Sequence, residues 1–315
     1  MAVSPAGRGT KLRLQGDRRA MTEIRPRRSV LAMPGSNPRV MEKARGLPTD
    51  VVMIDLEDGV APDMKAEGRE AVAATVAARP YGRREVVVRI NSLDTPWGEA
   101  DLARIAPAGP DAIVIPKVSG PDALVSVGSR LRRLGAPDRT RVWAMIETPL
   151  AILHIAEIAS AARDVDTRLS CLLVGPNDLA KTSRVRLGVP GRPALMPWLM
   201  NVVMAARAYD IDVIDGIYNA FRDESGFRAE CEQGRDSGFD GKMLIHPSQI
   251  ATANALFGPS EAEIEEARAI IAVFTEPENR ARGAIGFRGR MIERLHAVEA
   301  ARIVALADAI AARAA

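Results

Sequence analysis

The feature that most constrains the fold of this chain is a series of eight short apolar runs, each followed closely by polar residues or by glycine and proline. Helix-like stretches separate the runs, and the β-branched residues within the runs favour strands. Eight strands that alternate with helices predict a closed parallel (β/α)8 barrel, in which the carboxyl ends of all strands share one face. The runs cover residues 29–32, 51–54, 86–88, 112–115, 142–146, 171–174, 211–214 and 243–245.

The chain is longer than such a barrel requires. It has 315 residues, whereas one TIM barrel takes about 250. We predict a disordered basic leader over residues 1–20, the barrel over 21–258 and a C-terminal helical extension over 259–315. In this extension we expect a helix from Ser260 to Thr275, a glycine-rich stretch over 282–289 and a last helix over Met291–Ala312. Glycines suit a hinge, so we interpret the extension as a lid over the active face; a packing appendage on the barrel bottom is the alternative.

The charge distribution restricts the classes of partner. Net charge is +3, but residues 1–28 carry Lys11 and seven arginines against Asp17 and Glu23. The remainder is slightly acidic, so nucleic acid is not an expected partner. No apolar run approaches the roughly 18 residues of a membrane span, so no membrane association is expected. Two isolated cysteines, Cys171 and Cys231, predict reduced structural thiols and a cytoplasmic protein.

Two carboxylates suggest a metal site. Glu147 and Asp178 lie just past the fifth and sixth predicted strands, so neighbouring barrel positions would present them side by side. Hard oxygen ligands with room for water suit Mg²⁺, with Mn²⁺ as an alternative. The cation and two carboxylates would be neutral together, which leaves Arg89 to bind an anionic substrate. The alternative is a structural ion network that joins Glu147 to Arg89 or Lys117. Zinc is disfavoured because the histidines form no ligand cluster; they are His154, His246 and His296.

A denser acidic cluster, Asp55, Glu57 and Asp58, follows the second strand. Three carboxylates this close require compensation by metal-bound water or by cations. They therefore either hydrogen-bond to water on the metal or cap the loop. His246 is expected to be a structural histidine bonded to the turn that follows it.

Seven segments in a fixed order give the chain a resemblance to a known family. They are Arg28–Gly35, Asp55–Val60, Val88–Asn91, Pro116–Lys117, Ile146–Pro149, Gly175–Leu179 and Gly238–Gln249. In this order they resemble the citrate lyase β-subunit-like family of CoA-ester lyases, within the HpcH/HpaI aldolase superfamily. The resemblance covers about residues 27–312. It implies a TIM barrel, dependence on a divalent metal, and a homo-oligomer, commonly a trimer, whose C-terminal segment lies over a neighbour's active site.

The resemblance also implies roles for individual residues. Glu147 and Asp178 match the family's metal ligands, and Arg89 matches its contact with the substrate carboxylate. Glu57 and Asp58 match the acidic pair near the metal. From their places in the matching segments, Lys117 and Pro149 are expected to contact the substrate.

The C-terminal segment departs from the family's pattern at two positions, Glu293 and Leu295, the second of which is often proline in the family. Gly289–Glu293 resembles a lid motif that usually reads Gly-x-Met-Ile-Asp, in which the aspartate is a catalytic acid/base. Here the residue is Glu293, and its extra methylene moves the carboxyl by more than about 1 Å.

The implied reaction is the reversible cleavage of a 3-hydroxyacyl-CoA such as malyl-, citramalyl- or citryl-CoA into an acyl-CoA and a 2-oxo acid such as glyoxylate or pyruvate. Mg²⁺ would stabilise the developing 2-oxo acid, Arg89 would bind its carboxylate, and Glu293 of an adjacent subunit would protonate the acetyl-CoA enolate.

Three alternatives stay open from the sequence. The first is a metal-dependent aldolase acting on free 2-oxo acids; that branch usually has a histidine where Asp58 stands, which argues against it. The second is hydrolysis of the same CoA thioester, with Glu293 activating water. The third is a non-catalytic acyl-CoA-binding protein.

Overall fold

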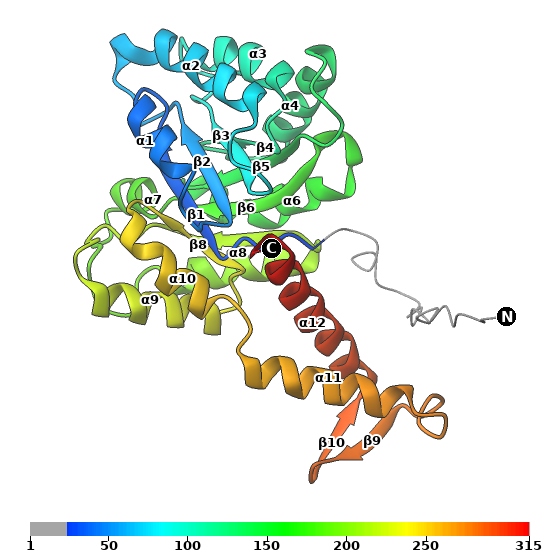
Figure 1. Cartoon of the computed structure of the whole chain (residues 1–315). Coiled ribbons are helices and arrows are strands. Elements are labelled where there is room, and N and C mark those ends of the chain that lie inside the picture. The colour runs from blue at the N-terminus through cyan, green and yellow to red at the C-terminus, as the bar shows by residue number, and fades with distance from the viewer. Residues whose placement is uncertain (1–23, 315) are drawn as a thin grey trace, which may run out of the picture. The chain divides into compact units, whose positions relative to one another are not determined.

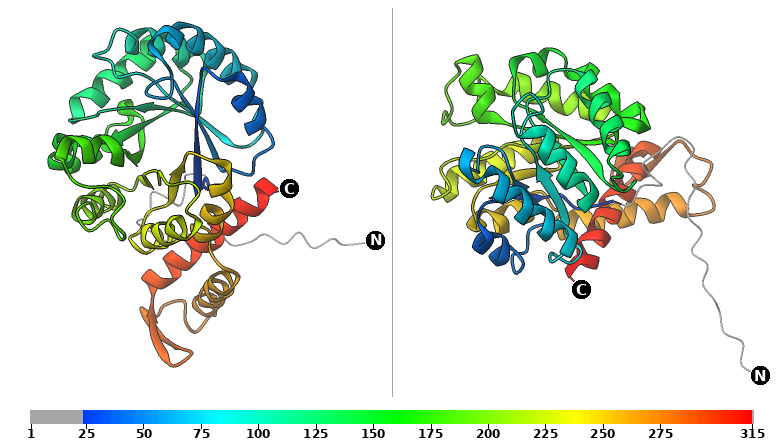
Figure 2. Two further views of the ribbon diagram at one scale, coloured as in Figure 1. Left: turned by 90° about the vertical axis from the view of Figure 1, so that its left-hand side faces the viewer. Right: turned by 90° about the horizontal axis from the view of Figure 1, so that it is seen from above.

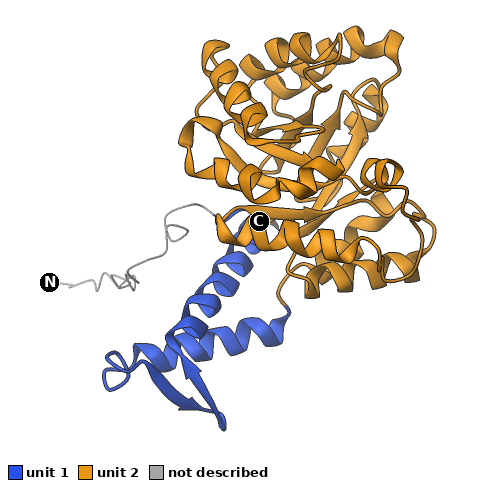
Figure 3. Ribbon diagram, turned by 180° about the vertical axis from the view of Figure 1, so that it is seen from behind, with its two compact units in different colours: residues 1–25, 260–312 blue, residues 26–259, 313–315 orange. Residues whose placement is uncertain are grey.

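The computed structural model describes residues 24–314, so the leader predicted over residues 1–20 lies outside the described part. The described residues divide into two compact units: a barrel of residues 26–259 with 313–314, and a C-terminal unit of residues 260–312 with 24–25 (Figure 3). Each unit has its own buried apolar cluster.

Eight parallel strands close into a barrel in the order of the sequence, with β8 pairing with β1 (Figure 1). This confirms the predicted (β/α)8 fold. All eight apolar runs overlap the observed strands. The strands are β1 (Ser29–Pro34), β2 (Val51–Asp55), β3 (Glu85–Arg89), β4 (Ala112–Ile115), β5 (Arg141–Ile146), β6 (Leu169–Val174), β7 (Asp212–Asp215) and β8 (Gly241–Leu244).

Alternate residues of each strand point into the barrel because the side chains of a strand alternate between its two faces. The interior cluster includes Val51 and Met53 of β2 and Trp143 and Met145 of β5, all essentially inaccessible to solvent. The intervening residues, such as Val52, belong to the second and larger cluster that packs against the helices. This register determines which residue at each strand end faces the mouth of the barrel.

The helices follow the strands and lie outside them, as the blue-to-green helices show in Figure 2. The helical segment that follows β5 is interrupted at His154, whose backbone is not helical and whose Nδ1 lies 3.0 Å from the carbonyl oxygen of Ser119. The helices are α1 (Pro38–Ala44), α2 (Lys65–Ala78), α3 (Gly98–Ala108), α4 (Pro121–Arg133), α5 (Pro149–Leu153), α6 (Ile155–Ser160), α7 (Pro176–Ser183), α8 (Met196–Ala208), α9 (Glu224–Asp236) and α10 (Ile250–Leu256), with short 3-10 helices η2 (Pro62–Met64), η3 (Ala161–Arg163), η4 (Val165–Thr167) and η5 (Pro247–Gln249).

A buried ion cluster occupies the amino-terminal end of the barrel. Arg27 donates to both carboxylate oxygens of Glu85 at 2.7 Å and to Asp212 at 2.6 Å. Its guanidinium also lies 4.8 Å from the ring centroid of Trp143. Glu85 and Asp212 are the first residues of β3 and β7, so the cluster pairs its buried charges at the end of the barrel opposite the carboxyl-terminal face.

The C-terminal unit consists of α11 (Glu261–Thr275), strands β9 (Ala284–Phe287) and β10 (Arg290–Glu293), and α12 (Arg294–Ala314). The prediction of a last helix from Met291 is therefore wrong at its start. The glycine-rich stretch forms an antiparallel hairpin, with Arg288 and Gly289 both at positive φ in its two-residue turn. Positive φ at both turn residues matches the type I′ turn of tight hairpins. The two strands are too short for an alternation of apolar and polar residues to be recognised in the sequence.

Candidate active site

The strand register brings charged side chains from distant parts of the chain to the carboxyl-terminal face of the barrel. Asp55 and Arg89 are the last residues of β2 and β3, and they pair in register. Each follows an interior residue by two positions, so both face the barrel mouth. Glu147 follows β5 directly, and Asp178 lies in the first turn of α7 after β6. The structure therefore brings these four charged side chains together at the face where the sequence predicted them.

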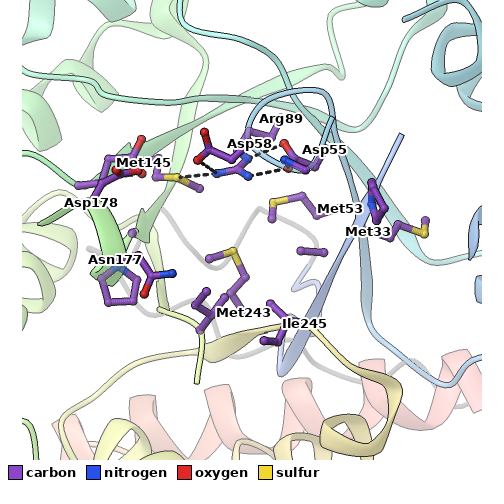
Figure 4. A pocket seen from close by; sticks show the side chains of 17 residues that line it. Met33, Met53, Asp55, Asp58, Arg89, Met145, Asn177, Asp178, Met243 and Ile245 are labelled. Carbon is purple, nitrogen blue, oxygen red and sulfur yellow. Dashed lines mark hydrogen bonds and ion pairs between the residues drawn. The ribbon is translucent and has the colours of Figure 1, made fainter. Parts of the chain in front are cut away.

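These residues line a cavity of about 390 Å³ (Figure 4). Of the sequence-predicted site residues, Arg89, Asp58, Glu147 and Asp178 line it, whereas Glu57, Lys117 and Pro149 do not. The lining residues are Ala32, Met33, Pro34, Met53, Asp55, Asp58, Gly59, Arg89, Met145, Glu147, Gly175, Pro176, Asn177, Asp178, Ile217, Met243 and Ile245.

Arg89 is held by carboxylates of the acidic loop. Its Nε and Nη2 donate to the two carboxylate oxygens of Asp55 at 2.7 and 2.6 Å, a bidentate pair. Its Nη1 lies 3.0 Å from Glu57 and 3.9 Å from Asp58. Burial alone would lower the pKa of Arg89, but Asp55 and Glu57 raise it above its ordinary value. The guanidinium charge is therefore largely compensated by protein carboxylates, which the sequence did not reveal.

Glu57 is buried between two cations. Besides Arg89, it accepts a hydrogen bond of 2.9 Å from Nζ of Lys117. Burial raises the pKa of Glu57, and Arg89 and Lys117 oppose that rise. Both hypotheses about the acidic cluster required compensation of its charge, and these two cations provide it.

Asp55 also caps the loop that follows it. Its two carboxylate oxygens accept hydrogen bonds of 2.8 Å from the backbone N–H groups of Glu57 and Gly59. For Asp55, the loop-cap interpretation is therefore correct.

A buried lysine holds the same loop from the side opposite the cavity, a contact that sequence reasoning missed. Lys65 is 5% exposed, and its Nζ donates to the carbonyl oxygens of Leu56 and Glu57 and to Oδ1 of Asn91, at 2.6–2.8 Å. All three ammonium protons are thus satisfied. Asn91 is held in turn by Asp101 at 2.6 Å. Lys65 therefore has no free donor for a phosphate group.

Glu147 and Asp178 are the pair predicted to bind a metal. Oε1 of Glu147 accepts a hydrogen bond of 2.8 Å from the backbone N–H of Lys117. Its neighbour Gly175 has no side chain, and a Cβ there would lie 2.5 Å from Oε2 of Glu147. Burial, with a further contribution from Glu57 and a smaller one from Asp178, raises the pKa of Glu147 to about 8. The alternative of an ion pair between Glu147 and Arg89 or Lys117 is not what the structure shows, since Glu57 is the ion-pair partner of both cations.

This arrangement suits a divalent cation. Among the described residues, no group of three or more His, Cys, Asp and Glu side chains is placed to hold a metal ion. Two carboxylates beside an open cavity are instead the kind of donor set that Mg²⁺ uses, since Mg²⁺ keeps several waters and takes one or two protein carboxylates. A cation here would also relieve the unfavourable burial of the Glu147 charge.

Three predicted residues lie elsewhere or have structural roles. Glu293 is an exposed residue of β10 in the C-terminal unit, and its backbone N–H donates to Nδ1 of His296 at 2.9 Å. Pro149 is the first residue of α5. His246 is bonded to Ser248 of the following turn at 2.8 Å between Nδ1 and Oγ, which confirms its structural role.

Among the polar lining residues, Asn177 was not identified from the sequence. Asn177 exchanges two side-chain hydrogen bonds with Asn219, at 2.8 and 3.3 Å, which ties the start of α7 to the segment after β7. Its position directly before Asp178, a predicted metal ligand, could have indicated that it lies at the site.

No helix of the described residues is long and apolar enough to cross a membrane.

Comparison with known proteins agrees with the geometry. The chain is 48% identical over 292 residues to a (3S)-malyl-CoA thioesterase of Cereibacter sphaeroides, which covers 92% of this chain and 98% of that protein. It is 34% identical over 313 residues to an L-malyl-CoA/beta-methylmalyl-CoA lyase of the same species, covering 91% of this chain and 96% of that one.

A solved structure supports the same relationship. CitE of Mycobacterium tuberculosis, in complex with magnesium, acetoacetate and coenzyme A, has a TM-score of 0.71 and 26% identity, covering 89% of this chain and 97% of that chain. The profile of the family described as HpcH/HpaI aldolase/citrate lyase matches residues 28–247. This protein therefore belongs to the HpcH/HpaI aldolase/citrate lyase family.

Proposed function

We propose that this protein is a Mg²⁺-dependent enzyme that acts on a 3-hydroxyacyl-CoA, and that it hydrolyses malyl-CoA to malate and CoA. The observation that carries this proposal is the position of Glu147 and Asp178 in one cavity beside Arg89. The 48% identity to a (3S)-malyl-CoA thioesterase, against 34% to a lyase, supports hydrolysis ahead of carbon–carbon cleavage.

In this proposal Glu147 and Asp178 hold the cation, with Mn²⁺ as an alternative metal. When bound, the cation supplies a Lewis acid for a substrate oxygen. Asp55 accepts hydrogen bonds from the Nε–H of Arg89 and from one N–H of its Nη2. Other N–H groups of the guanidinium therefore remain to orient the substrate carboxylate. Lys117 and Pro149 contact the remainder of the substrate.

Hydrolysis also needs a group that accepts the proton of the attacking water. We assign this role to Glu293, which in the related lid motif is an aspartate acid/base, and we assign Glu57 and Asp58 to ordering water near the cation. The side chain of Asp58 is 63% exposed and lines the cavity, so it is accessible to solvent.

The second candidate is cleavage of malyl-CoA into acetyl-CoA and glyoxylate, or of citramalyl-CoA into acetyl-CoA and pyruvate. The similarity to a malyl-CoA lyase over almost the whole chain favours it. The same two carboxylates would bind the cation, and Glu293 would donate a proton instead of accepting one.

A product assay separates the two reactions. The protein is incubated with Mg²⁺ and malyl-CoA, and the thioester products are resolved by mass spectrometry. Malate and free CoA support hydrolysis, whereas acetyl-CoA and glyoxylate would overturn hydrolysis in favour of the lyase. Glu147→Gln and EDTA should each abolish turnover, and loss in neither would refute the metal-dependent scheme.

A further inference from the structure

One wall of the cavity carries no charged side chain; it begins at Pro34, which pairs in register with Asp55. Five lining residues form this apolar wall: Ala32 and Pro34 of β1, Ile217 after β7, Met243 of β8, and Ile245 directly after β8. Strands β7, β8 and β1 are consecutive neighbours in the closed barrel. The wall is therefore one continuous surface.

The period of two along each strand explains the contrast between the two sides. Met53 and Met145 of the barrel interior are followed two residues later by Asp55 and Glu147. Met243 occupies the same interior cluster but is followed two residues later by Ile245. Figure 4 shows Met243 and Ile245 across the cavity from Arg89 and its carboxylate partners.

The charges of the lining residues are unbalanced. Four carboxylates line the cavity, namely Asp55, Asp58, Glu147 and Asp178, and among the described lining residues Arg89 is the one cation. Asp55 and Glu57 already compensate Arg89. The remaining donors of Arg89, with a divalent cation at Glu147 and Asp178, would serve a single substrate carboxylate. A second carboxylate placed against the apolar wall would lose its hydration and gain no partner.

We propose that the apolar wall selects the substituent on the hydroxyl-bearing carbon of the acyl-CoA, admitting hydrogen or methyl and rejecting carboxymethyl. The inference rests on the proposed function and narrows its substrate class. The three candidate thioesters differ in this one group: it is hydrogen in malyl-CoA, methyl in citramalyl-CoA and carboxymethyl in citryl-CoA. The first two fit the wall and the third does not.

The first test compares the three thioesters by consumption in the presence of Mg²⁺. Citramalyl-CoA should have a kcat/KM within about 10-fold of malyl-CoA, since a methyl group changes transition-state binding only modestly. Citryl-CoA should be lower by at least about 100-fold, because its additional carboxylate has no partner. If none of the three is consumed, the proposed function fails. If citryl-CoA is consumed within 10-fold of malyl-CoA, the inference alone fails.

The second test adds a cation to the wall. Ile245 is 38% exposed, so Ile245→Lys can be accommodated with its ammonium at the cavity mouth. The ratio of kcat/KM for citryl-CoA to that for malyl-CoA should rise at least about 10-fold, since a nearby ammonium compensates the second carboxylate. Ile245→Gln provides a polar, uncharged control that should leave the ratio within threefold of the original value.

A cation added elsewhere controls for net charge. Leu153 of α5 is 76% exposed and does not line the cavity. Leu153→Lys should leave the ratio unchanged. An equal rise in Leu153→Lys and Ile245→Lys, or no rise in a folded Ile245→Lys protein, would overturn the inference.

Discussion

Single residues of the acidic loop depend on a partner that takes no part in the cavity surface. Lys65 lies behind the loop, and its Nζ binds the carbonyl oxygens of Leu56 and Glu57. The loop carries Asp55 and Glu57, the two carboxylates closest to Arg89. A change at Lys65 should therefore reach the active site through the loop backbone.

Lys65→Met removes the three donors while keeping the length of the side chain. It leaves Oδ1 of Asn91 without its hydrogen bond, at a cost of about 1–3 kcal/mol for a buried unsatisfied group. The carbonyl oxygens of Leu56 and Glu57 each lose one hydrogen bond but keep those from Nδ2 of Asn91 and from the N–H of Val60. We expect a lower free energy of unfolding in urea, and a fall in kcat/KM of at least about 10-fold from the displaced loop.

The control for this prediction is Lys65→Arg, which keeps the charge and several donors. It should recover part of kcat/KM. A Lys65→Met protein that is destabilised but retains the kcat, the KM and the pH profile of the original would show that Lys65 is structural only.

The two cysteines are predicted to be unreactive at pH 8 in the folded protein because of the raised pKa values of their thiols. Burial raises the pKa of Cys231 to about 12 and that of Cys171 well above its ordinary value. Because the thiolate is the reactive form, both should be inert at pH 8 in the folded protein. A thiol reagent such as DTNB should release no colour from native protein and two equivalents after denaturation. Rapid reaction of the native protein at pH 8 would contradict the burial of these thiols.

At the scale of elements, the strands of the barrel were more predictable than the hairpin of the C-terminal unit. The runs that became β2 and β4 could be identified because parallel strands are buried on both faces and carry continuous apolar residues. The hairpin β9–β10 could not, since its exposed residues and glycines resemble a loop. Glu293 was therefore predicted to lie in the C-terminal extension, which is correct, but in a helix, whereas it lies in strand β10.

The residue at position 293 is expected to influence which reaction occurs. Glu293→Asp restores the carboxylate length of the related lid motif and moves the carboxyl by about 1 Å. We expect the ratio of acetyl-CoA to free CoA formed from malyl-CoA to rise at least about 10-fold, since donor position governs proton transfer to an enolate. Glu299→Asp, an exposed glutamate of α12, is the matched control. An unchanged product ratio in Glu293→Asp would remove Glu293 from the scheme.

At the scale of the whole molecule, barrel closure places residues from across the sequence in one cavity. Arg89, Glu147 and Asp178 could be predicted because they follow strand ends, where barrel active sites form. The partners of Arg89 could not be predicted, because they depend on the path of the loop after β2 rather than on strand order. Lys65 was missed for a similar reason, since its contacts arise from the packing of α2 against that loop.

The expected homotrimer has a consequence that mixing of variants can test. If Glu293 acts at the site of a neighbouring subunit, Glu147→Gln and Glu293→Gln chains should complement each other when expressed together. Random mixing in a closed ring leaves about one quarter of the sites with both native residues, so about one quarter of the activity should return. Light scattering should give the mass of three chains. A monomer, or no recovery of activity in mixed oligomers, would contradict this arrangement.

The most direct test of the account is the binding of one divalent cation by Glu147 and Asp178. Mn²⁺ titration followed by electron paramagnetic resonance should show one site per chain in the original protein. Glu147→Gln and Asp178→Asn should each weaken binding by at least about 10-fold, since each removes a charged ligand. Glu157→Gln, an exposed glutamate of α6, should bind as the original does. Undiminished binding by both ligand variants would contradict the account.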